Sequence, residues 1–370
     1  MFTQTVFFLV LLQSTVVEGG TFSFLMRSTK PSPTRSPAGN GALGPQRDVF
    51  GQTAHSTHID RRYLGEVSVG TPPRTFVVII DTSSLELARA FSNRSTLYDP
   101  WSSSTAKWGQ GSRKVDDGLR NPKLVRGRYF EDVLAFGNTS AGTALRLKKP
   151  AMFGAADQTF GLEQGTLGLG LSTRFDKRKP IVEQAFKEGL LDRPLFSLHF
   201  KKCPQWELEC EDGGMVTLGG EDPKNCGPVL GWAPAFSDGG PWQFRVSALR
   251  VGGFVHRAEA IVSTDSSAPF IYLPGEVLEG VVRALNASGG GNSWTVDCDR
   301  KFELKFTING RTYAVGHEEL TWDYANNNEC ILNIARAKGS EWILGVPFQR
   351  ALCNVHDFQK RRIGFALSKH

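Results

Sequence analysis

The sequence predicts an all-β protein in which two related lobes pack together. Three observations support this prediction. The chain has 370 residues, which is more than one ordinary hydrophobic core organises. Its 40 Gly and 19 Pro separate short runs rich in Val, Phe, Thr and Ser, which favours strands broken by turns over long helices. Each half of the chain also contains the same motif, an apolar strand that runs into an Asp followed by hydroxyl residues.

The first 19 residues are predicted to be a secretory signal peptide. An apolar run at residues 6–12 is followed by small residues at Gly19 and Gly20, although the usual Lys or Arg is absent from the start. An uncleaved membrane anchor is the alternative, but the run is short for a span of about 20 residues. No later segment is apolar for long enough to cross a bilayer, so we expect a mature protein without a membrane span.

Residues 20–60 are expected to form a pro-segment or a linker outside the core. They are rich in Ser, Pro, Thr and Gly and show little apolar periodicity. The stretch is also basic, and Arg61-Arg62 offers a processing point just before the first expected strand. An inhibitory pro-segment and a disordered linker both fit this composition.

The N-terminal β lobe is expected to cover residues 61–232. YLGEVSVG, which begins at Tyr63, alternates apolar and polar residues, and residues 71–73 form a Pro-rich turn. TFVVII then predicts a buried strand that ends at Asp81. Because burying an uncompensated carboxylate is costly, such an Asp is usually hydrogen-bonded, paired or catalytic. A turn-initiating Asp in the sequence DTSS is the structural alternative.

The C-terminal β lobe, expected at residues 233–370, repeats this combination of an apolar strand and a following Asp. In EAIVSTDSSAPFIYLP an apolar strand leads to Asp265, and a further apolar stretch follows it. Each half also has a later Leu-Gly step, at Gly168 and Gly345, at a similar distance from its Asp. The repetition predicts a duplicated lobe and favours a paired role for the two Asp residues.

The span from Tyr63 to Leu367 resembles the pepsin-like aspartic proteases. YLGEVSVGTPPRTFVVIIDTSS is similar to the family's opening strands and its Asp-Thr-Gly-Ser motif. LYDPWSSST, GTLGLGLS and PLFSLHF resemble the segments that follow, and WILGVPFQRALCNVHDFQKRRIGFA resembles the closing strands. The resemblance implies a bilobal pepsin-like acid protease fold with an active-site cleft between the lobes.

The resemblance further implies an aspartic endopeptidase that hydrolyses peptide bonds with a water molecule held between Asp81 and Asp265. Two close carboxylates cannot both ionise easily, so they share one proton; one acts as general base while its protonated partner polarises the carbonyl. Thr82 and Ser266 are expected to cross-link the two motifs, and Ser84 to support the first Asp. No metal, cofactor or covalent intermediate is implied, and an acidic optimum is expected.

Several family positions are altered in this chain. Ser83 and Ser267 replace the Gly that follows each Asp-hydroxyl pair, and we expect their backbone N–H groups to reach the carboxylates. Ala268 stands where the second supporting hydroxyl is usual, and the family's flap Tyr falls on Arg120. A catalytically impaired binding protein that uses the same cleft is therefore the alternative function.

The position of the second Asp also has two interpretations. Alignment from the upstream Ala-Ile-Val puts Ser263 at the catalytic position, whereas alignment from the downstream Pro274 puts Asp265 there. We take Asp265, since the residues that follow it then match without a gap.

The cysteines and the sequons favour secretion or residence in the lumen of the secretory pathway or a vacuole. Six Cys behind a signal peptide predict disulfides, and although six Cys allow 15 pairings, Cys203 with Cys210 and Cys298 with Cys330 could close local loops. Glycosylation sequons begin at Asn93, Asn138 and Asn286.

The net charge of +6 is scattered and accompanies no nucleic-acid module, so we expect no nucleic-acid partner. No CxxC or HExxH pattern occurs, and no metal site is expected. We expect a monomer that acts on peptides or proteins.

Overall fold

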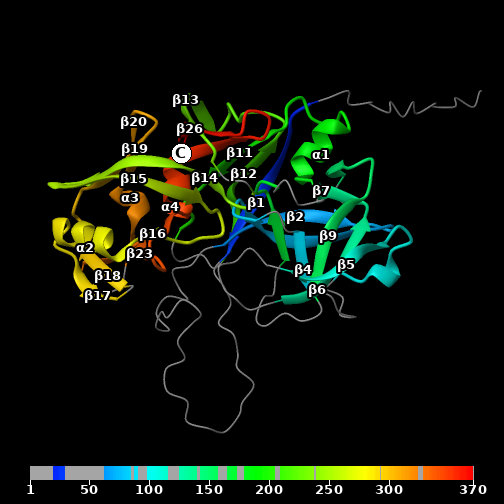
Figure 1. Ribbon diagram of the computed structural model, residues 1–370, viewed down its shortest axis with the longest axis horizontal. Helices are drawn as coiled ribbons and strands as arrows, with labels where there is room; N and C mark the ends of the chain where they lie inside the picture. Colours follow the sequence, from blue (N-terminus) through cyan, green and yellow to red (C-terminus); the bar gives the residue numbers. More distant parts are fainter. Residues whose placement is uncertain are drawn as a thin grey trace, which may run out of the picture.

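Strands dominate the computed structural model, and Figure 1 shows them gathered into two halves on either side of a central sheet. The structure describes residues 20–29, 62–84, 87–90, 98–115, 125–139, 142–156, 165–172, 179–204, 209–236, 239–291, 293–323 and 328–369. Within these residues the strands form sheets of 15, 7 and 4 members. The predicted all-β class is confirmed.

The first half is built around the strand that leads to Asp81. β2 (Arg62–Val69) and β3 (Arg74–Asp81) pair in antiparallel fashion around a turn with a cis Thr71-Pro72 bond. The apolar run of β3 is buried at Phe76 and from Val78 to Ile80, as its uninterrupted hydrophobicity predicted. β10 (Gly165–Gly168) runs parallel to β3, and β4 (Leu87–Ala90) pairs with β10. In this ladder Gly168 lies opposite Asp81.

The second half repeats this arrangement. β15 (Phe254–Thr264) runs parallel to β24 (Trp342–Leu344), and β16 (Ile271–Leu273) pairs with β24 in antiparallel fashion. Thr264 lies opposite Leu344, so the next residues along the two strands are Asp265 and Gly345. The register of the first half is therefore repeated in the second, as the duplicated motif predicted.

A central sheet joins the two halves. Its order runs β13 (Cys226–Pro234), β26 (Arg362–Ser368), β25 (Leu352–Asp357), β11 (Leu195–Phe200) and β12 (Glu209–Leu218), and then continues through β1 (Phe22–Thr29) into β2. The last two strands of the chain thus lie beside strands from the first half. The lobe boundary after residue 232 stays a prediction, because both halves contribute to this sheet.

The first described segment, residues 20–29, was expected to lie outside the core but forms a strand of the central sheet. Residues 20–60 were expected to lie outside the core, yet β1 pairs with β12 on one side and β2 on the other. Phe24 and Met26 alternate along β1 and are buried. Eight residues are too short a window for this alternation to stand out against the Ser and Thr around it. Residues 30–60 lie outside the described part of the chain.

The remaining elements complete the two halves. Four helices occur in the described residues: α1 (Ile181–Lys187), α2 (Gly275–Ala284), α3 (His317–Leu320) and α4 (Val346–Ala351). The other elements of the first half are η2 (Pro100–Ser102), β5 (Lys107–Val115), β6 (Val125–Asp132), β7 (Leu134–Asn138), β8 (Thr143–Arg146) and β9 (Ala151–Ala156). Those of the second half are β14 (Trp242–Val251), β17 (Ser288–Gly290), β18 (Ser293–Asp297), β19 (Glu303–Ile308), β20 (Arg311–Gly316), β21 (Thr321–Asp323), β22 (Glu329–Leu332) and β23 (Ile334–Arg336).

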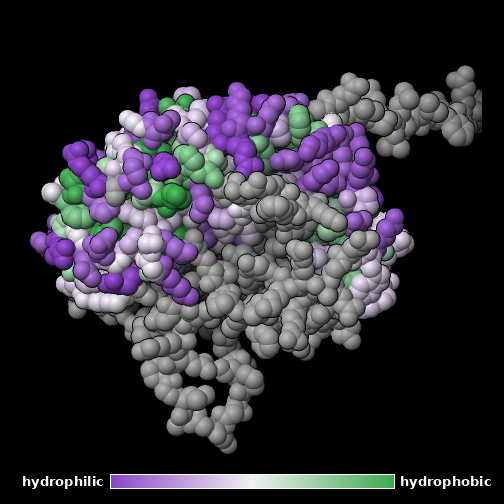
Figure 2. Space-filling model, in the orientation of Figure 1, coloured by the Kyte–Doolittle hydropathy of each residue, from purple (hydrophilic) through white to green (hydrophobic). Residues whose placement is uncertain are grey.

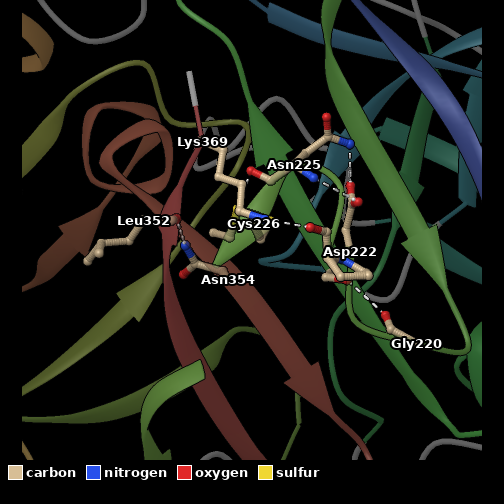
Figure 3. The surroundings of a disulfide bond; sticks show 10 residues. Gly220, Asp222, Asn225, Cys226, Leu352, Asn354 and Lys369 are labelled. Carbon is tan, nitrogen blue, oxygen red and sulfur yellow. Dashed lines mark hydrogen bonds between the residues drawn. A yellow bond between two sulfur atoms is a disulfide. The ribbon is translucent and has the colours of Figure 1, made fainter. Parts of the chain in front are cut away.

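All six cysteines are paired. The disulfides Cys203–Cys210 and Cys298–Cys330 are the two local pairings that the sequence suggested, and Cys226–Cys353 joins β13 to β25 in the central sheet. Figure 3 shows the surroundings of this third bond, where the Asn225 N–H and side-chain amide donate to the Asp222 carboxylate.

None of the helices in the described part of the chain has the length and apolar character needed to cross a bilayer. On the face drawn in Figure 2, hydrophilic residues dominate the described surface, and hydrophobic residues form small separate groups.

Candidate active site

Asp81 lies at the end of β3 and has no exposed surface. Its Oδ1 accepts two hydrogen bonds from Ser83, one from the backbone N–H at 2.7 Å and one from the hydroxyl at 2.6 Å. Its Oδ2 accepts a hydrogen bond from the Ser84 hydroxyl at 2.7 Å. The turn that follows β3 therefore brings three donors back to the carboxylate that begins it.

Asp265 occupies the corresponding place directly after β15 and is also buried. Its Oδ1 accepts hydrogen bonds from the Ser267 N–H at 2.9 Å and the Ser267 hydroxyl at 2.7 Å. The next residue is Ala268, whose N–H donates to the Asp265 carbonyl at 3.2 Å. The two turns thus hold their carboxylates in the same way, except that only the first has a hydroxyl at the third position.

Thr82 and Ser266 join the two turns reciprocally. The Thr82 N–H donates to Ser266 Oγ at 3.0 Å, and the Ser266 N–H donates to Thr82 Oγ1 at 3.1 Å. Each hydroxyl also donates a hydrogen bond to the backbone of the other half. Thr82 Oγ1 donates to the Thr264 carbonyl at 3.3 Å, and Ser266 Oγ donates to the Ile80 carbonyl at 2.8 Å. These buried bonds fix the two Asp-bearing turns against each other, although they are far apart in the sequence.

The two carboxyl groups interact electrostatically. Burial, followed by the negative charge of Asp265, raises the pKa of Asp81 from its ordinary value of 3.8 to about 6. The hydrogen bonds from Ser83 and Ser84 oppose this rise, because they stabilise the ionised form. Asp81 and Asp265 consequently titrate as a pair, in which one proton can be retained at weakly acidic pH.

The Leu-Gly steps pack directly against the backbone of the two turns. In the first half, the Leu169 N–H donates to the Asp81 carbonyl at 2.7 Å; in the second, the Asp265 N–H donates to the Leu344 carbonyl at 3.3 Å. A Cβ on Gly345 would lie 2.2 Å from the Phe270 carbonyl oxygen and 2.4 Å from that of Ala268. The close approach leaves room only for glycine.

Ser263, the other interpretation of the second position, lies within β15 opposite Ile343. Its hydroxyl donates to the Trp342 carbonyl at 3.4 Å. The structure brings Asp265, and not Ser263, to the turn that faces Asp81. Ser263 therefore lies two residues before Asp265, inside the strand and not in the turn that follows it.

Two hydroxyl donors were missed by the sequence interpretation. Ser83 and Ser267 were expected to offer only their backbone N–H groups, but each also donates its hydroxyl to the same carboxylate oxygen. The replacement of Gly by Ser at both positions was the available signal. Arg120, at the expected flap position, lies outside the described residues. Among those described, no group of three or more His, Cys, Asp or Glu side chains is placed to hold a metal ion.

Comparisons with known proteins agree with this geometry. A family model described as eukaryotic aspartyl protease matches residues 62–368. Aspartic protease 6 of Caenorhabditis elegans is 28% identical over 333 residues, which cover 84% of this chain and 82% of that protein. Renin-2 of Mus musculus is 25% identical over 348 residues (87% and 83%), and cathepsin E of Aquarana catesbeiana is 27% identical over 328 residues (84% and 80%). The span matched by the family model contains both Asp81 and Asp265.

Proposed function

Because this chain belongs to the eukaryotic aspartyl protease family, we propose that it is a secreted aspartic endopeptidase that hydrolyses peptide bonds at acidic pH. The observation that carries this proposal is the reciprocal hydrogen bonding of Thr82 and Ser266, which holds the two Asp-bearing turns together. It supports a catalytic pair of Asp81 and Asp265, whose charges interact.

The mechanism follows from the shared proton. A water molecule between the carboxylates is deprotonated by the ionised member of the pair as it attacks the substrate carbonyl, while the protonated member donates a hydrogen bond to the carbonyl oxygen. Because the pKa of Asp81 is raised to about 6, the singly protonated pair persists into weakly acidic solution. Above that pH the remaining proton is lost, and neither carboxyl group can then donate a hydrogen bond to the substrate carbonyl.

Thr82, Ser266 and Ser84 support the pair without touching substrate in this mechanism. Thr82 and Ser266 set the separation of the two turns through their buried cross-links. The Ser84 hydroxyl donates a hydrogen bond to Oδ2 of Asp81 and so fixes the plane of that carboxylate. No cofactor takes part.

The proposed substrate is a peptide or an unfolded protein, bound as an extended chain by a monomeric enzyme. Three disulfides support a route through an oxidising compartment, with a signal peptide at residues 1–19 and secretion or lumenal residence as the outcome. Asn286 is exposed in the turn after α2, which suits a glycosylated sequon. A mass loss of the secreted protein on treatment with an N-glycosidase, smaller by one glycan in Asn286→Gln, tests this assignment.

The function is tested by cleavage of an unfolded protein substrate at acidic pH. We expect pepstatin-sensitive turnover that Asp81→Asn and Asp265→Asn each reduce by at least about 10²–10⁴-fold, the usual contribution of general acid–base groups. Asp212→Asn is the matched control, since Asp212 is an exposed carboxylate paired with Lys201. Folding of each variant is followed by circular dichroism.

A folded wild-type protein that binds pepstatin but cleaves nothing would overturn the endopeptidase and favour the impaired binding protein. Turnover that survives Asp265→Asn would remove that residue from the pair.

A further inference from the structure

One residue in each turn makes an unusual double contact with its carboxylate. Ser83 and Ser267 each donate both the backbone N–H and the side-chain hydroxyl to Oδ1 of the Asp two positions earlier. The four distances lie between 2.6 and 2.9 Å. A glycine at either position, which is what the family resemblance leads one to expect, could supply only the N–H.

The direction of these bonds is fixed by chemistry. An ionised carboxylate is an acceptor only, so the serine hydroxyl must be the donor. Hydrogen bonds between a hydroxyl and a carboxylate are short and about twice as strong as bonds between neutral groups. They favour the ionised form of the acid over the protonated form, because protonation neutralises the acceptor.

The described segments beside the pair show which charges lie close to it. Among the described residues, Asp265 is the one titratable group whose charge raises the pKa of Asp81. The segments packed around the two carboxylates, at residues 82–84, 165–170, 266–268 and 342–346, carry no acidic or basic side chain. Within these described segments, the serine hydroxyls are the side-chain groups that donate to the Oδ1 atoms of the pair.

We propose that the hydroxyl groups of Ser83 and Ser267 are positioning groups that stabilise the singly ionised Asp81–Asp265 pair and extend its working range to lower pH. Mutual repulsion favours the first protonation of the pair, and burial favours the second, which would leave no base for the water. Two hydroxyl donors on the Oδ1 atoms oppose this second protonation. They also fix the rotation of each carboxylate, since N–H and O–H approach the same oxygen from one residue.

The inference rests on the proposed function for its kinetic test, which uses Ser83→Ala, Ser267→Ala and the double variant. Alanine removes the hydroxyl and keeps the N–H donor. We expect the acid limb of the pH profile of kcat/KM to move up by about one pH unit per hydroxyl, or about tenfold in rate on that limb. Ser83→Thr and Ser267→Thr, which retain a hydroxyl, should restore the wild-type limb.

Ser197→Ala is the matched control, because it also removes a buried serine hydroxyl, one that donates to the Gly220 carbonyl and not to a carboxylate. It should leave the acid limb in place. Alanine variants whose acid limb coincides with that of wild type would overturn the inference, and so would a shift that threonine does not reverse. If one alanine variant does not fold, the other decides the question alone.

A second measurement does not depend on turnover. Carboxyl ¹³C titration of Asp-labelled protein, with Asp81→Asn and Asp265→Asn as assignment standards, follows the pair directly. We expect the lower midpoint to rise in the alanine variants. Absence of protease activity in wild type would defeat the proposed function, whereas unchanged midpoints in a folded alanine variant would defeat this inference.

Discussion

Asp81 is a buried acid on which opposing forces act at the level of single atoms. Burial and the charge of Asp265 favour its protonated form, while hydrogen bonds from Ser83 and Ser84 favour its ionised form. The first two effects prevail, since the pKa rises to about 6. A carboxylate in this state is poised to retain or release a proton in weak acid, which is what a catalytic pair requires.

The raised pKa of Asp81 predicts a pH-dependent stability. Between about pH 4 and pH 6 the folded protein retains a proton that the unfolded chain has lost, so the free energy of unfolding falls as pH rises through this window, by about 3 kcal/mol in total. Asp81→Asn should abolish this fall. Urea denaturation of both proteins at a series of pH values measures it, and parallel pH dependences of the two would contradict the assignment.

The buried cross-link predicts a large effect of Ser266→Ala. The change removes the acceptor of the Thr82 N–H and the donor to the Ile80 carbonyl, and leaves both buried groups without these bonds. We expect a loss of about 2–6 kcal/mol in unfolding free energy, from about 1–3 kcal/mol for each of the two unsatisfied groups. Ser104→Ala, which removes an exposed hydroxyl bonded to the Thr71 carbonyl, should change little in the same denaturation measurement. Equal effects of the two substitutions would refute the role of the cross-link.

At the scale of elements, β25 shows how a central position in a sheet buries polar side chains along with apolar ones. Its residues LCNVHD are all buried, including the polar Asn354 and His356, because β25 lies between β11 and β26 in the central sheet and both of its faces are covered. His356 stacks on Phe196 at 4.4 Å between ring centroids and meets the Trp242 ring at 5.1 Å. Burial in this cluster lowers the pKa of His356 to about 3.

The neutral His356 predicts acid sensitivity of this sheet. Between about pH 6.5 and pH 3 the unfolded chain binds a proton that the folded protein does not, so the unfolding free energy falls as pH falls, by about 3 kcal/mol at pH 4. His356→Phe keeps a stacked ring and should remove this loss. The window overlaps that of Asp81 with the opposite sign, so each variant must be compared with wild type separately. A difference between His356→Phe and wild type that does not vary with pH would contradict the prediction.

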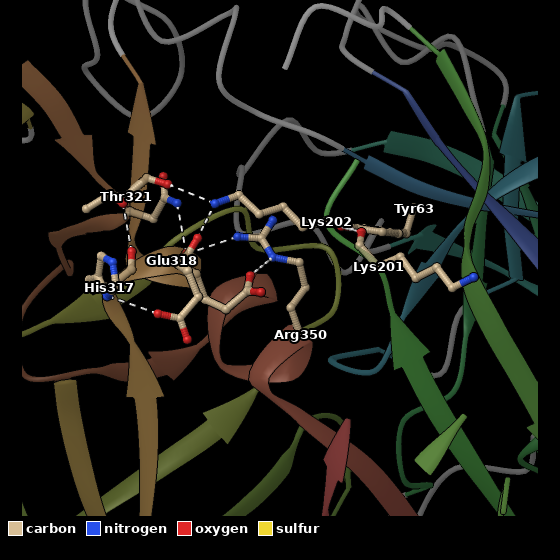
Figure 4. A network of polar contacts seen from close by, with 9 residues as sticks. Tyr63, Lys201, Lys202, His317, Glu318, Thr321 and Arg350 are labelled. Atoms are coloured by element: carbon tan, nitrogen blue, oxygen red, sulfur yellow. Dashed lines mark hydrogen bonds and ion pairs between the residues drawn. The ribbon is translucent and has the colours of Figure 1, made fainter. Parts of the chain in front are cut away.

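At the scale of the whole molecule, the two halves are joined at several places. Strands from both ends of the chain share the central sheet, and Thr82 and Ser266 connect the two turns. Figure 4 shows a third junction, where Lys202, which follows β11, donates to the Glu318 and Thr321 carbonyls around α3. Nearby, the buried Arg350 pairs with the Glu319 carboxylate and donates to the Glu319 carbonyl at 3.0 Å.

The disulfide Cys226–Cys353 predicts a long-range contribution to stability. It closes a separation of 127 residues, for which loop-closure entropy in the unfolded chain gives about 5 kcal/mol. Removing Cys203–Cys210, with a separation of 7 residues, should cost about 2 kcal/mol by the same reasoning. Denaturation of the two double-alanine variants tests the ranking, and a larger loss from the shorter loop would reverse it.

Much of the fold could be predicted because its signals are local. The uninterrupted apolar run before Asp81, the Gly and Pro between strands, and the second copy of the motif at Asp265 are each visible within a short stretch of sequence. The all-β class, the family and two disulfide pairings followed from such signals. β1 was missed because its strand is specified by its neighbours β12 and β2 more than by its own residues.

The candidate site could be predicted only in part. The sequence predicted Asp81, Thr82 and Ser84 because they lie within one four-residue motif. It left Ser263 and Asp265 as alternatives for the second acid position. The hydroxyl contacts of Ser83 and Ser267 were not foreseen, because a replacement of Gly says nothing about where the new side chain points.

The sequence by itself determined the apolar strand that precedes each of the two acids and the turn that follows it, since hydrophobic periodicity and turn chemistry act over a few neighbouring residues. Only the tertiary structure decided that Thr264 pairs with Leu344, that Asp265 and not Ser263 lies in the turn joined to Thr82, and that Cys226 meets Cys353. These contacts join residues far apart along the chain. Their register depends on how complete sheets pack, which no short stretch of sequence encodes.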